Sequence, residues 1–184
     1  ADLIREISVA QLEHMFKTYG EEPHSHTIAY AIVAAVKRHP IMRTSQLVAV
    51  IDDAYRAILH APPGRKLWLG RGLHPATRTF QALRIAVNGE LKALEVMLPQ
   101  AFTLLPAGGR LAIVSFHSLE DRMVKQFMKP LCVRCICSPE QLQCTCSRIP
   151  RAVSLTHKAV QASQEEISTN PRSRSAKLRV LKKT

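Results

Sequence analysis

A nearly continuous apolar run, Leu111–Phe116, constrains the fold of this chain more than any other feature. It has the length of a strand and follows the turn-forming pair Gly108-Gly109, and Ser118 then opens a segment with the apolar spacing of a helix. A strand that is apolar along its length is typical of a parallel sheet with helices on both faces. We therefore expect a helix, a turn, a buried parallel strand and a helix in that order, as in a fragment of a doubly wound α/β sheet.

The first part of the chain predicts a separate, all-helical unit. Apolar residues recur at helical spacing in three segments, and these begin after Ser8, near Ile28 and after Thr44. A basic stretch rich in Pro and Gly, residues 60–73, interrupts the pattern. We place a domain boundary there. It separates a helical domain at residues 1–72 from a second domain at residues 73–184.

Two further elements are predicted in the second domain. Residues from Ala76 to Leu98 carry apolar side chains at spacings of three and four, which indicates one long amphipathic helix. Pro99 then kinks or ends it. Near the end of the chain, Leu178–Leu181 predicts a last strand, so the basic segment around it should dock on the sheet rather than form a disordered tail.

The charge of the chain indicates a polyanionic partner. Lys and Arg number 26 against 14 Asp and Glu, a net charge of +12. Residues 1–121 carry 13 basic and 11 acidic residues, whereas residues 122–184 carry 13 basic and only 3 acidic ones. The C-terminal third is therefore expected to meet nucleic acid. A merely soluble basic surface is the alternative.

All five cysteines lie in one short loop, which favours a metal site over a disulfide framework. Their pattern is Cys132-x2-Cys135-x-Cys137-x6-Cys144-x-Cys146. Disulfides would spread across a fold, whereas a local cluster can bring four thiolates to one ion. We expect a Cys-rich loop at residues 130–150 that holds a structural zinc ion. Cys132 is the spare, and the alternative is that it replaces Cys137 through the Cys132-x2-Cys135 spacing. The ligands would be Cys135, Cys137, Cys144 and Cys146. Reduced thiols in a flexible insertion are the alternative.

The end of the predicted strand is the first candidate site. Ligands of open α/β sheets bind at the carboxyl ends of strands, and His117 and Glu120 lie there. Ser118 and Asp121 fit a Ser-x-x-Asp capping pattern, so capping the helix is an alternative role for these two residues. His117 and Glu120 are not needed for that cap, so they are the stronger functional candidates.

Two groups of polar residues are candidate RNA contacts. On the helix after residue 76, polar residues at spacings of three share one face, and toward the end of the chain basic residues follow one another closely. The first group is Arg78, Gln81 and Arg84, and the second is Arg172, Arg174 and Lys177. The alternatives are a solvated helix face and a disordered basic tail.

Three segments together resemble one protein family. The segments His74–Val87, Pro106–Val124 and Asn170–Val180 are similar to the MraW type of small-subunit (16S) ribosomal RNA (cytosine-N4)-methyltransferases. The resemblance implies an enzyme that depends on S-adenosylmethionine. It also implies a Rossmann-like catalytic domain with an inserted helical domain. Its substrate would be N4 of a cytidine in small-subunit ribosomal RNA.

The resemblance also assigns roles to residues of this chain. His117, Glu120 and Asp121 would be catalytic, and Ser118 would join the Arg, Gln and Lys residues named above in binding RNA. The family's Gly-rich cofactor motif has no counterpart here, so the chain resembles a C-terminal portion whose cofactor site lies mostly upstream and which is inactive alone. The alternative function is a non-catalytic RNA-binding module with a zinc knuckle.

The sequence also bears on location and assembly. No apolar run reaches the ~18 residues of a membrane span, and no signal-peptide pattern follows Ala1. We therefore expect a cytoplasmic protein without a membrane partner. The sequence does not determine the oligomeric state, and a homodimer is one alternative.

Overall fold

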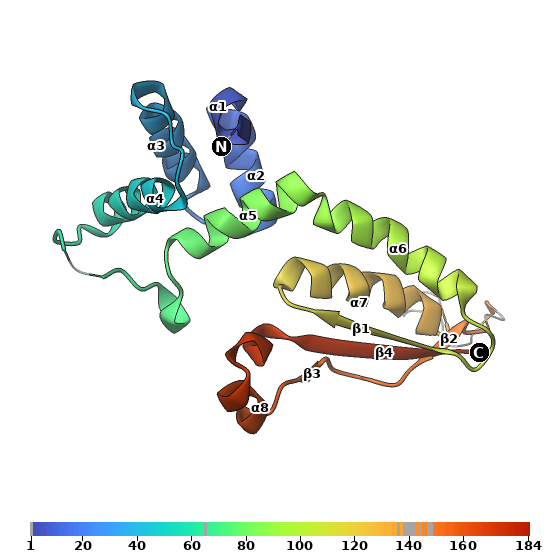
Figure 1. Cartoon of the computed structure of the whole chain (residues 1–184). Coiled ribbons are helices and arrows are strands. Elements are labelled where there is room, and N and C mark those ends of the chain that lie inside the picture. The colour runs from blue at the N-terminus through green and yellow to red at the C-terminus, as the bar shows by residue number, and fades with distance from the viewer. Residues whose placement is uncertain (1, 65, 136, 138–142, 144, 147–148) are drawn as a thin grey trace. The chain divides into compact units, whose positions relative to one another are not determined.

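The computed structural model describes residues 2–64, 66–135, 137, 143, 145–146 and 149–184. It divides into two compact units, Ala1–Glu90 and Leu91–Thr184, which we describe one at a time (Figure 1). The domain boundary expected at residue 72 stays a prediction. The first compact unit runs further along the chain because the helix after residue 76 packs against an early helix of the same unit.

The first unit is helical in its described elements. They are α1 (Asp2–Glu6), α2 (Val9–Gly20), α3 (Ser25–Arg38), α4 (Thr44–Leu59), the 3-10 turn η1 (Gly70–Gly72) and α5 (Ala76–Asn88). Its core contains Phe16 of α2, Ile32 of α3 and Tyr55 of α4, all fully shielded from solvent. Ser8 caps α2 as predicted, in a reciprocal capping box with Gln11.

The single long helix expected from Ala76 to Leu98 is wrong. The structure has α5, which ends at Asn88, and a separate helix α6 (Glu90–Leu104). Gly89 divides them because its φ of 63° lies in the left-handed region, where glycine ends helices at little cost. Pro99 does not end α6, which continues to Leu104.

The second unit contains a small antiparallel sheet. Its strands are β1 (Arg110–Ser115), β2 (Ala152–Ser154), β3 (Val160–Gln161) and β4 (Lys177–Lys183). β4 pairs with β1 along one edge and with β2 and β3 along the other, always antiparallel. The predicted strand exists, but its pairing is not the parallel pairing expected. The strand is also not buried on both faces as expected, because its residues alternate between partly buried and exposed and only Ser115 is buried. An apolar run therefore fixes neither the burial of both faces nor the direction of the neighbouring strand.

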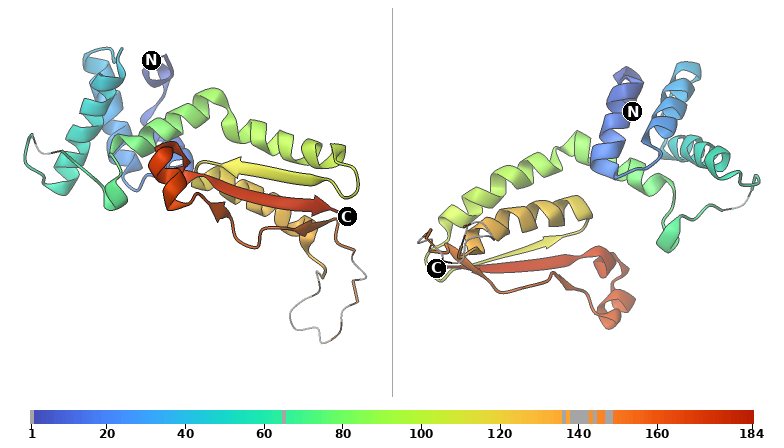
Figure 2. Two further views of the ribbon diagram at one scale, coloured as in Figure 1. Left: turned by 60° about the horizontal axis from the view of Figure 1, so that its bottom comes forward. Right: turned by 180° about the vertical axis from the view of Figure 1, so that it is seen from behind.

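Two helices cover one face of this sheet. α6 and α7 (Ser118–Cys132) lie along it, as the views of Figures 1 and 2 agree. Leu98, Val124 and Leu181, one from each of α6, α7 and β4, are buried together. Side chains of the opposite face stay open, and Val114 is 52% exposed. The basic segment docks as predicted, because β4 is the strand that all the others join.

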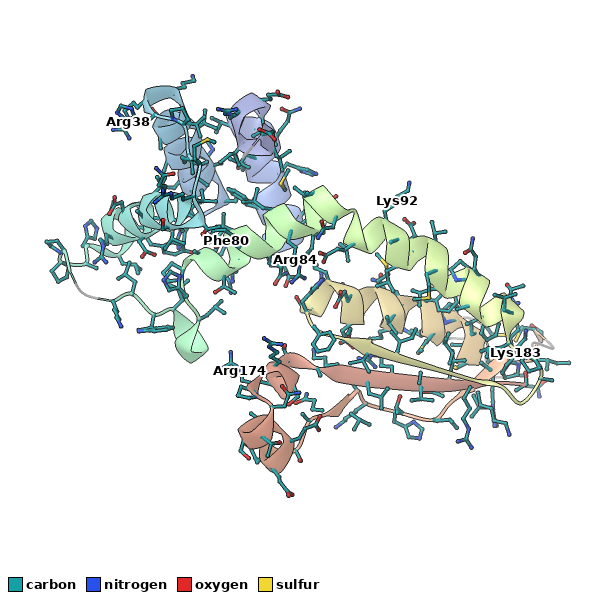
Figure 3. All side chains as sticks on the ribbon, viewed as in Figure 1. Arg38, Phe80, Arg84, Lys92, Arg174 and Lys183 are labelled. Atoms are coloured by element: carbon teal, nitrogen blue, oxygen red, sulfur yellow. The ribbon has the colours of Figure 1, made fainter. Side chains whose placement is uncertain are left out.

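Short elements complete the second unit. α8 (Gln164–Thr169) and η2 (Pro171–Ser175) precede β4. At the other end of β4, the Lys183 ammonium donates to the carbonyls of Phe102, Thr103 and Leu105 at the end of α6 (Figure 3). A cation at a helix C-terminus is stabilising because the last carbonyls lack intrahelical donors. No helix in the described part of the chain is both long and apolar enough to cross a membrane.

Candidate functional site

The junction between β1 and α7 is a reciprocal cap made by two predicted site residues. His117 is the N-cap of α7, and its Nδ1 accepts the backbone N–H of Glu120 at 3.3 Å. In return, Glu120 Oε2 accepts the backbone N–H groups of Phe116 at 2.8 Å and His117 at 3.3 Å. The expectation that these two side chains are not needed for capping is therefore wrong. The cap is one residue earlier than Ser118, because an imidazole nitrogen takes the place of a hydroxyl oxygen.

This arrangement keeps Glu120 ionised. The close His117 side chain lowers the pKa of Glu120 most, and the N–H groups of Phe116 and His117 lower it further against an opposing effect of burial. The result is a pKa of about 2. A carboxylate with such a low pKa is a weak proton acceptor near neutral pH, because a good general base has a pKa close to the working pH.

The second ring nitrogen of His117, Nε2, makes no hydrogen bond within the described part of the chain. Nε2 is buried and has no hydrogen-bond partner among the described residues, and the side chain is 7% exposed. Glu120 Oε1 lies 3.3 Å from Nε2 without the alignment of a hydrogen bond. Nδ1 accepts a hydrogen bond from the backbone N–H of Glu120, so it carries no proton itself. In neutral His117 the ring proton is therefore on Nε2. The ring therefore offers a hydrogen-bond donor.

Asp121 binds two basic side chains of β4. Arg179 forms two hydrogen bonds to it, Nε to Oδ1 at 2.7 Å and Nη2 to Oδ2 at 3.1 Å, and Lys177 Nζ lies 3.5 Å from Oδ2. Arg179 is the main cause of a lowered pKa at Asp121. Asp121 thus links α7 to β4. Ser118, the first residue of α7, is exposed. The Ser-x-x-Asp cap weighed as an alternative is not formed by Asp121.

The predicted polar face of α5 contacts the rest of the first unit. Gln81 Nε2 donates to the carbonyl of Tyr19, in the last turn of α2, at 3.1 Å. Arg84 donates three hydrogen bonds to the carboxylate of Glu90. Arg78 is half-buried, and its charge lowers the pKa of Tyr55 against the larger, raising effects of burial and Glu22. These residues therefore have structural partners, and their RNA contacts stay a prediction.

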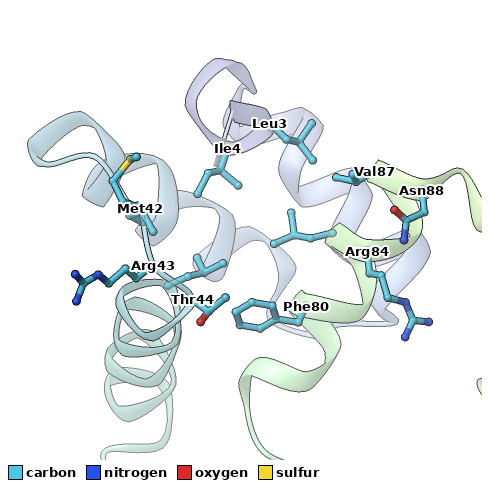
Figure 4. Close-up of a pocket in the computed structure, with 12 residues that line it drawn as sticks. Leu3, Ile4, Met42, Arg43, Thr44, Phe80, Arg84, Val87 and Asn88 are labelled. Atoms are coloured by element: carbon cyan, nitrogen blue, oxygen red, sulfur yellow. The ribbon is translucent and has the colours of Figure 1, made fainter.

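A cavity of about 400 Å³ lies beside the same helix. Phe80, Leu83 and Val87 of α5 line it together with residues of α1 and the start of α4 (Figure 4). Its walls are mainly apolar, and the Arg84 guanidinium points away from Phe80. This cavity brings no set of polar groups together for chemistry.

Two of the predicted RNA contacts are open to solvent. Arg172 and Arg174 lie in η2 on either side of the buried Ser173, and both are exposed. Figure 3 labels Arg174. Asn170 holds this turn by accepting the backbone N–H of Arg172 at 3.3 Å. The η2 turn therefore leaves two guanidinium groups open to solvent, whereas Lys177 approaches Asp121.

Three of the predicted zinc ligands are close together. The sulfur atoms of Cys135, Cys137 and Cys146 lie within 4.8 Å of one another, so this group could hold a metal ion. The backbone of Thr145 is the main cause of a lowered pKa at the Cys137 thiol, which favours the thiolate that binds metals. Cys144, the fourth predicted ligand, lies outside the described residues. Cys132 ends α7, and burial raises its pKa, in keeping with its expected place outside the ligand set.

Comparison with known proteins decides the family. The model of the MraW methylase family matches residues 1–184. The chain belongs to the MraW methylase family. Among curated relatives, ribosomal RNA small subunit methyltransferase H of Geobacter sp. (strain M21) is 48% identical over 183 residues, covering 100% of this chain and 56% of the relative.

Other relatives agree with this placement in the MraW methylase family. The protein of the same name from Anaeromyxobacter sp. (strain K) is 45% identical over 99% of this chain, and that from Thermomicrobium roseum is 47% identical over 97%. The two matches cover 56% and 52% of the length of the Anaeromyxobacter and Thermomicrobium proteins, respectively. The chain therefore spans about half the length of the curated relatives it matches, and the resemblance inferred from the sequence is confirmed.

Sequence reasoning missed one residue that organises the site. Arg179 was not singled out, although it forms the shortest contact to Asp121. The signal was present, since Arg179 lies on the predicted strand 178–181 and Lys177 directly precedes that strand. Residues two apart on a strand share one face of the sheet. A charged pair on a buried face requires an acidic partner from the covering helix.

Proposed function

We propose that this chain is part of a methyltransferase that transfers the methyl group of S-adenosylmethionine to N4 of a cytidine in small-subunit (16S-type) ribosomal RNA. The observation that carries the proposal is the 48% identity to a ribosomal RNA small subunit methyltransferase H over 183 residues. The substrate and the site of action follow from that relationship. We also propose that the protein acts in the cytoplasm, where ribosomal RNA is modified.

The second unit has features of a partial sheet, which supports its assignment to a larger Rossmann-like domain. β1 and β2 are both antiparallel to β4, so they are parallel to each other, and α7 lies between them in sequence. Many doubly wound sheets include one antiparallel strand. Among the described residues β1 pairs only with β4, and Val114 and Val153 are exposed on the sheet. The remaining strands of a full domain would pair with the free edge of β1, and its remaining helices would cover these side chains, with residues 1–72 as the helical insert.

The described residues do not fit S-adenosylmethionine. β1 is followed by Phe116, His117 and Ser118, with no glycine-rich turn. Gly108 and Gly109 precede β1, and their N–H groups already donate to the carbonyls of Lys183 and Pro106. We therefore place the cofactor site in a part of the methyltransferase that this chain does not contain, and we derive no step through it.

The residues of the β1–α7 junction can position a cytosine. Its N4 is a poor nucleophile because its lone pair is delocalised into the ring, so orientation relative to the methyl donor is a large part of catalysis. The Nε2–H of His117 would donate to ring N3, which is adjacent to the amino group, after a rotation of the imidazole that exposes this buried nitrogen. Glu120 sets the tautomer and orientation of His117, and its low pKa makes it a positioning residue rather than a base. Asp121 fixes α7 on β4.

A chimera tests this function. Residues 1–184 would replace the matching segment of the 48%-identical Geobacter relative, and the product would methylate small-subunit RNA that lacks the modification. We expect N4-methylcytidine by mass spectrometry, and we expect calorimetry to show no micromolar cofactor binding by residues 1–184 alone. A folded chimera that binds RNA but forms no N4-methylcytidine, while the parent relative does, would overturn the proposal.

A non-catalytic RNA-binding module with a zinc knuckle is the second candidate. The group formed by Cys135, Cys137 and Cys146 and the missing cofactor cradle favour it for the isolated chain. The same chimera separates the two functions, because a binding module would retain RNA affinity without restoring methyl transfer.

A further inference from the structure

A polar cavity lies in the first unit, lined by residues not discussed so far. Its volume is about 320 Å³, and it is formed by α4, by the loop that follows α4 and by His74 just before α5. Asp52 and Arg56 line it from the helix, and Lys66 and Trp68 line it from the loop. It therefore combines an aromatic ring, a carboxylate, an imidazole and two cations in one small volume.

The loop presents Trp68 to solvent. Leu67 before it is buried in the helical core and Leu69 after it is partly buried there, so the side chain between them points outward. The backbone is closed by the N–H of Leu69, which donates to the carbonyl of Leu73 at 2.8 Å. The indole is 61% exposed and stands at 87° to the His74 ring, with 6.1 Å between the ring centroids. Most of its surface is thus open to a stacking partner.

The cavity lining places the carboxylate of Asp52, an acceptor, near the imidazole of His74, a donor. Nδ1 of His74 accepts the backbone N–H of Ala76 at 3.2 Å, so in neutral His74 the proton is on Nε2. That nitrogen lies 3.9 Å from Oδ2 of Asp52. Oδ1 of Asp52 is shielded and has no hydrogen-bond partner in the described part of the chain. Leaving such an oxygen unpaired is costly, so a ligand with two donors would favour an Asp52 rotamer that exposes both carboxylate oxygens to the cavity.

This pattern complements the Watson–Crick edge of one base. Guanine offers two adjacent donors, N1–H and the N2 amine, to the two oxygens of a carboxylate. It also offers O6 as an acceptor for an N–H group. Adenine, cytosine and uracil can satisfy only one of the carboxylate oxygens from that edge. Lys66 is exposed at the rim, where it can meet a phosphate, while Arg56 holds the loop by donating to the carbonyl of Pro62 at 2.9 Å.

We propose that this cavity binds an unpaired guanine of the RNA substrate, stacked on Trp68 and held by Asp52 and His74. The inference rests on the proposed function, since it takes RNA as the partner. It adds a base-specific contact at a distance along the chain from the β1–α7 junction. Single-stranded RNA is recognised in this way, by stacking on an aromatic ring and hydrogen bonding to a base edge.

Trp68 is the only tryptophan of the chain, so its fluorescence reports on this cavity alone. Residues 1–184 would be titrated at low salt with the pentamers UUGUU, UUAUU and UUUUU, and with UUIUU, in which inosine lacks only the N2 amine. We expect quenching by UUGUU, with affinity about tenfold above UUAUU and UUIUU, since each lost hydrogen bond to a charged group has about this effect. Asp52→Asn should remove the guanine preference, and Trp68→Leu should weaken binding of labelled UUGUU at least about fivefold.

The controls separate this site from the proposed function. Glu6→Gln changes an exposed carboxylate of α1 and should leave the guanine preference intact. Pentamers that bind with equal affinity and without quenching would overturn the guanine site and leave RNA binding by the C-terminal third in place. Equal affinity of UUGUU and UUIUU, with Asp52→Asn folded and unchanged in its preference, would also overturn it.

Discussion

The carboxylate of Asp121 on α7 is gripped by the guanidinium of Arg179 on β4 through two hydrogen bonds of 2.7 and 3.1 Å. Both side chains are largely shielded from solvent. The pair therefore links the helix to the central strand of its sheet, and it does so next to the residues that cap the helix. Its removal should reveal how much of the site depends on this contact.

Asp121→Ala should destabilise the second unit by about 3 kcal/mol, because it leaves the Arg179 charge uncompensated in a shielded position. Urea unfolding monitored by circular dichroism measures the effect. The matched control is Lys177→Ala, which removes the longer and more exposed contact at 3.5 Å and should cost less than about 1 kcal/mol. Equal losses in the two variants would show that Arg179 is not the dominant partner.

Glu120 should make the fold sensitive to acid. Its pKa falls from the ordinary 4.5 to about 2 on folding, so the folded state binds fewer protons between these values. The stabilisation is complete above about pH 4.5 and is lost as the pH falls toward 2. Glu120→Gln should lower stability at pH 7 by about 1 kcal/mol and flatten this part of the curve. Unfolding measured from pH 2 to 7 tests it, and a curve that keeps its slope in the variant would contradict the assignment.

His117→Asn separates capping from chemistry. Asn is a good N-cap, so this variant should keep the stability of α7 while it removes the Nε2 donor. In the chimeric methyltransferase we expect turnover to fall at least about tenfold with cofactor affinity unchanged. His117→Ala should lose both stability and turnover. Full turnover in a folded His117→Asn variant would make His117 a structural cap alone.

RNA binding should depend steeply on salt. Neutralising about four phosphates of a single strand gives a log–log slope near −3, and the exposed Arg172 and Arg174 should account for about 1.4 of it. Filter binding by the double alanine variant tests this. The matched control replaces Lys37 and Arg38 at the end of α3, which are also exposed, and should leave the slope unchanged. A slope that changes with the control pair instead would relocate the RNA surface.

Protein purified without chelator should contain about one equivalent of zinc. Cys135, Cys137 and Cys146 would supply three thiolates and Cys144 the fourth, in a closed tetrahedral site. Cys146→Ser should release the metal and leave the unfolding of the sheet unchanged, whereas Cys132→Ser should retain it. Elemental analysis measures both. Less than about half an equivalent in the unmodified protein would favour reduced thiols without a metal.

Periodic apolar residues predicted the helices of the first unit, the strand at 110–115 and the last strand, because burial leaves a repeating mark in a sequence. The break at Gly89 and the antiparallel pairing were harder to predict. A helix C-cap depends on a single residue, and the apolar pattern of a strand is the same whether its neighbour is parallel or antiparallel. At the candidate site, the pattern of Ser118 and Asp121 concealed the pattern of His117 and Glu120 one position earlier. Only the position of the helix start distinguishes the two.

The place of β4 has a consequence for biosynthesis. This strand lies between β1 and β2, yet it follows both along the chain, and Ser115 pairs with Lys177, 62 residues later. Closing so long a loop is slow and entropically costly. During translation, α6, α7 and β1 leave the ribosome before the strand that they pack against, with Leu98 and Val124 uncovered. A nascent chain halted before residue 177 would therefore expose apolar surface and be prone to aggregation unless chaperones bind it. The unit would complete its folding only after β4 has been synthesised.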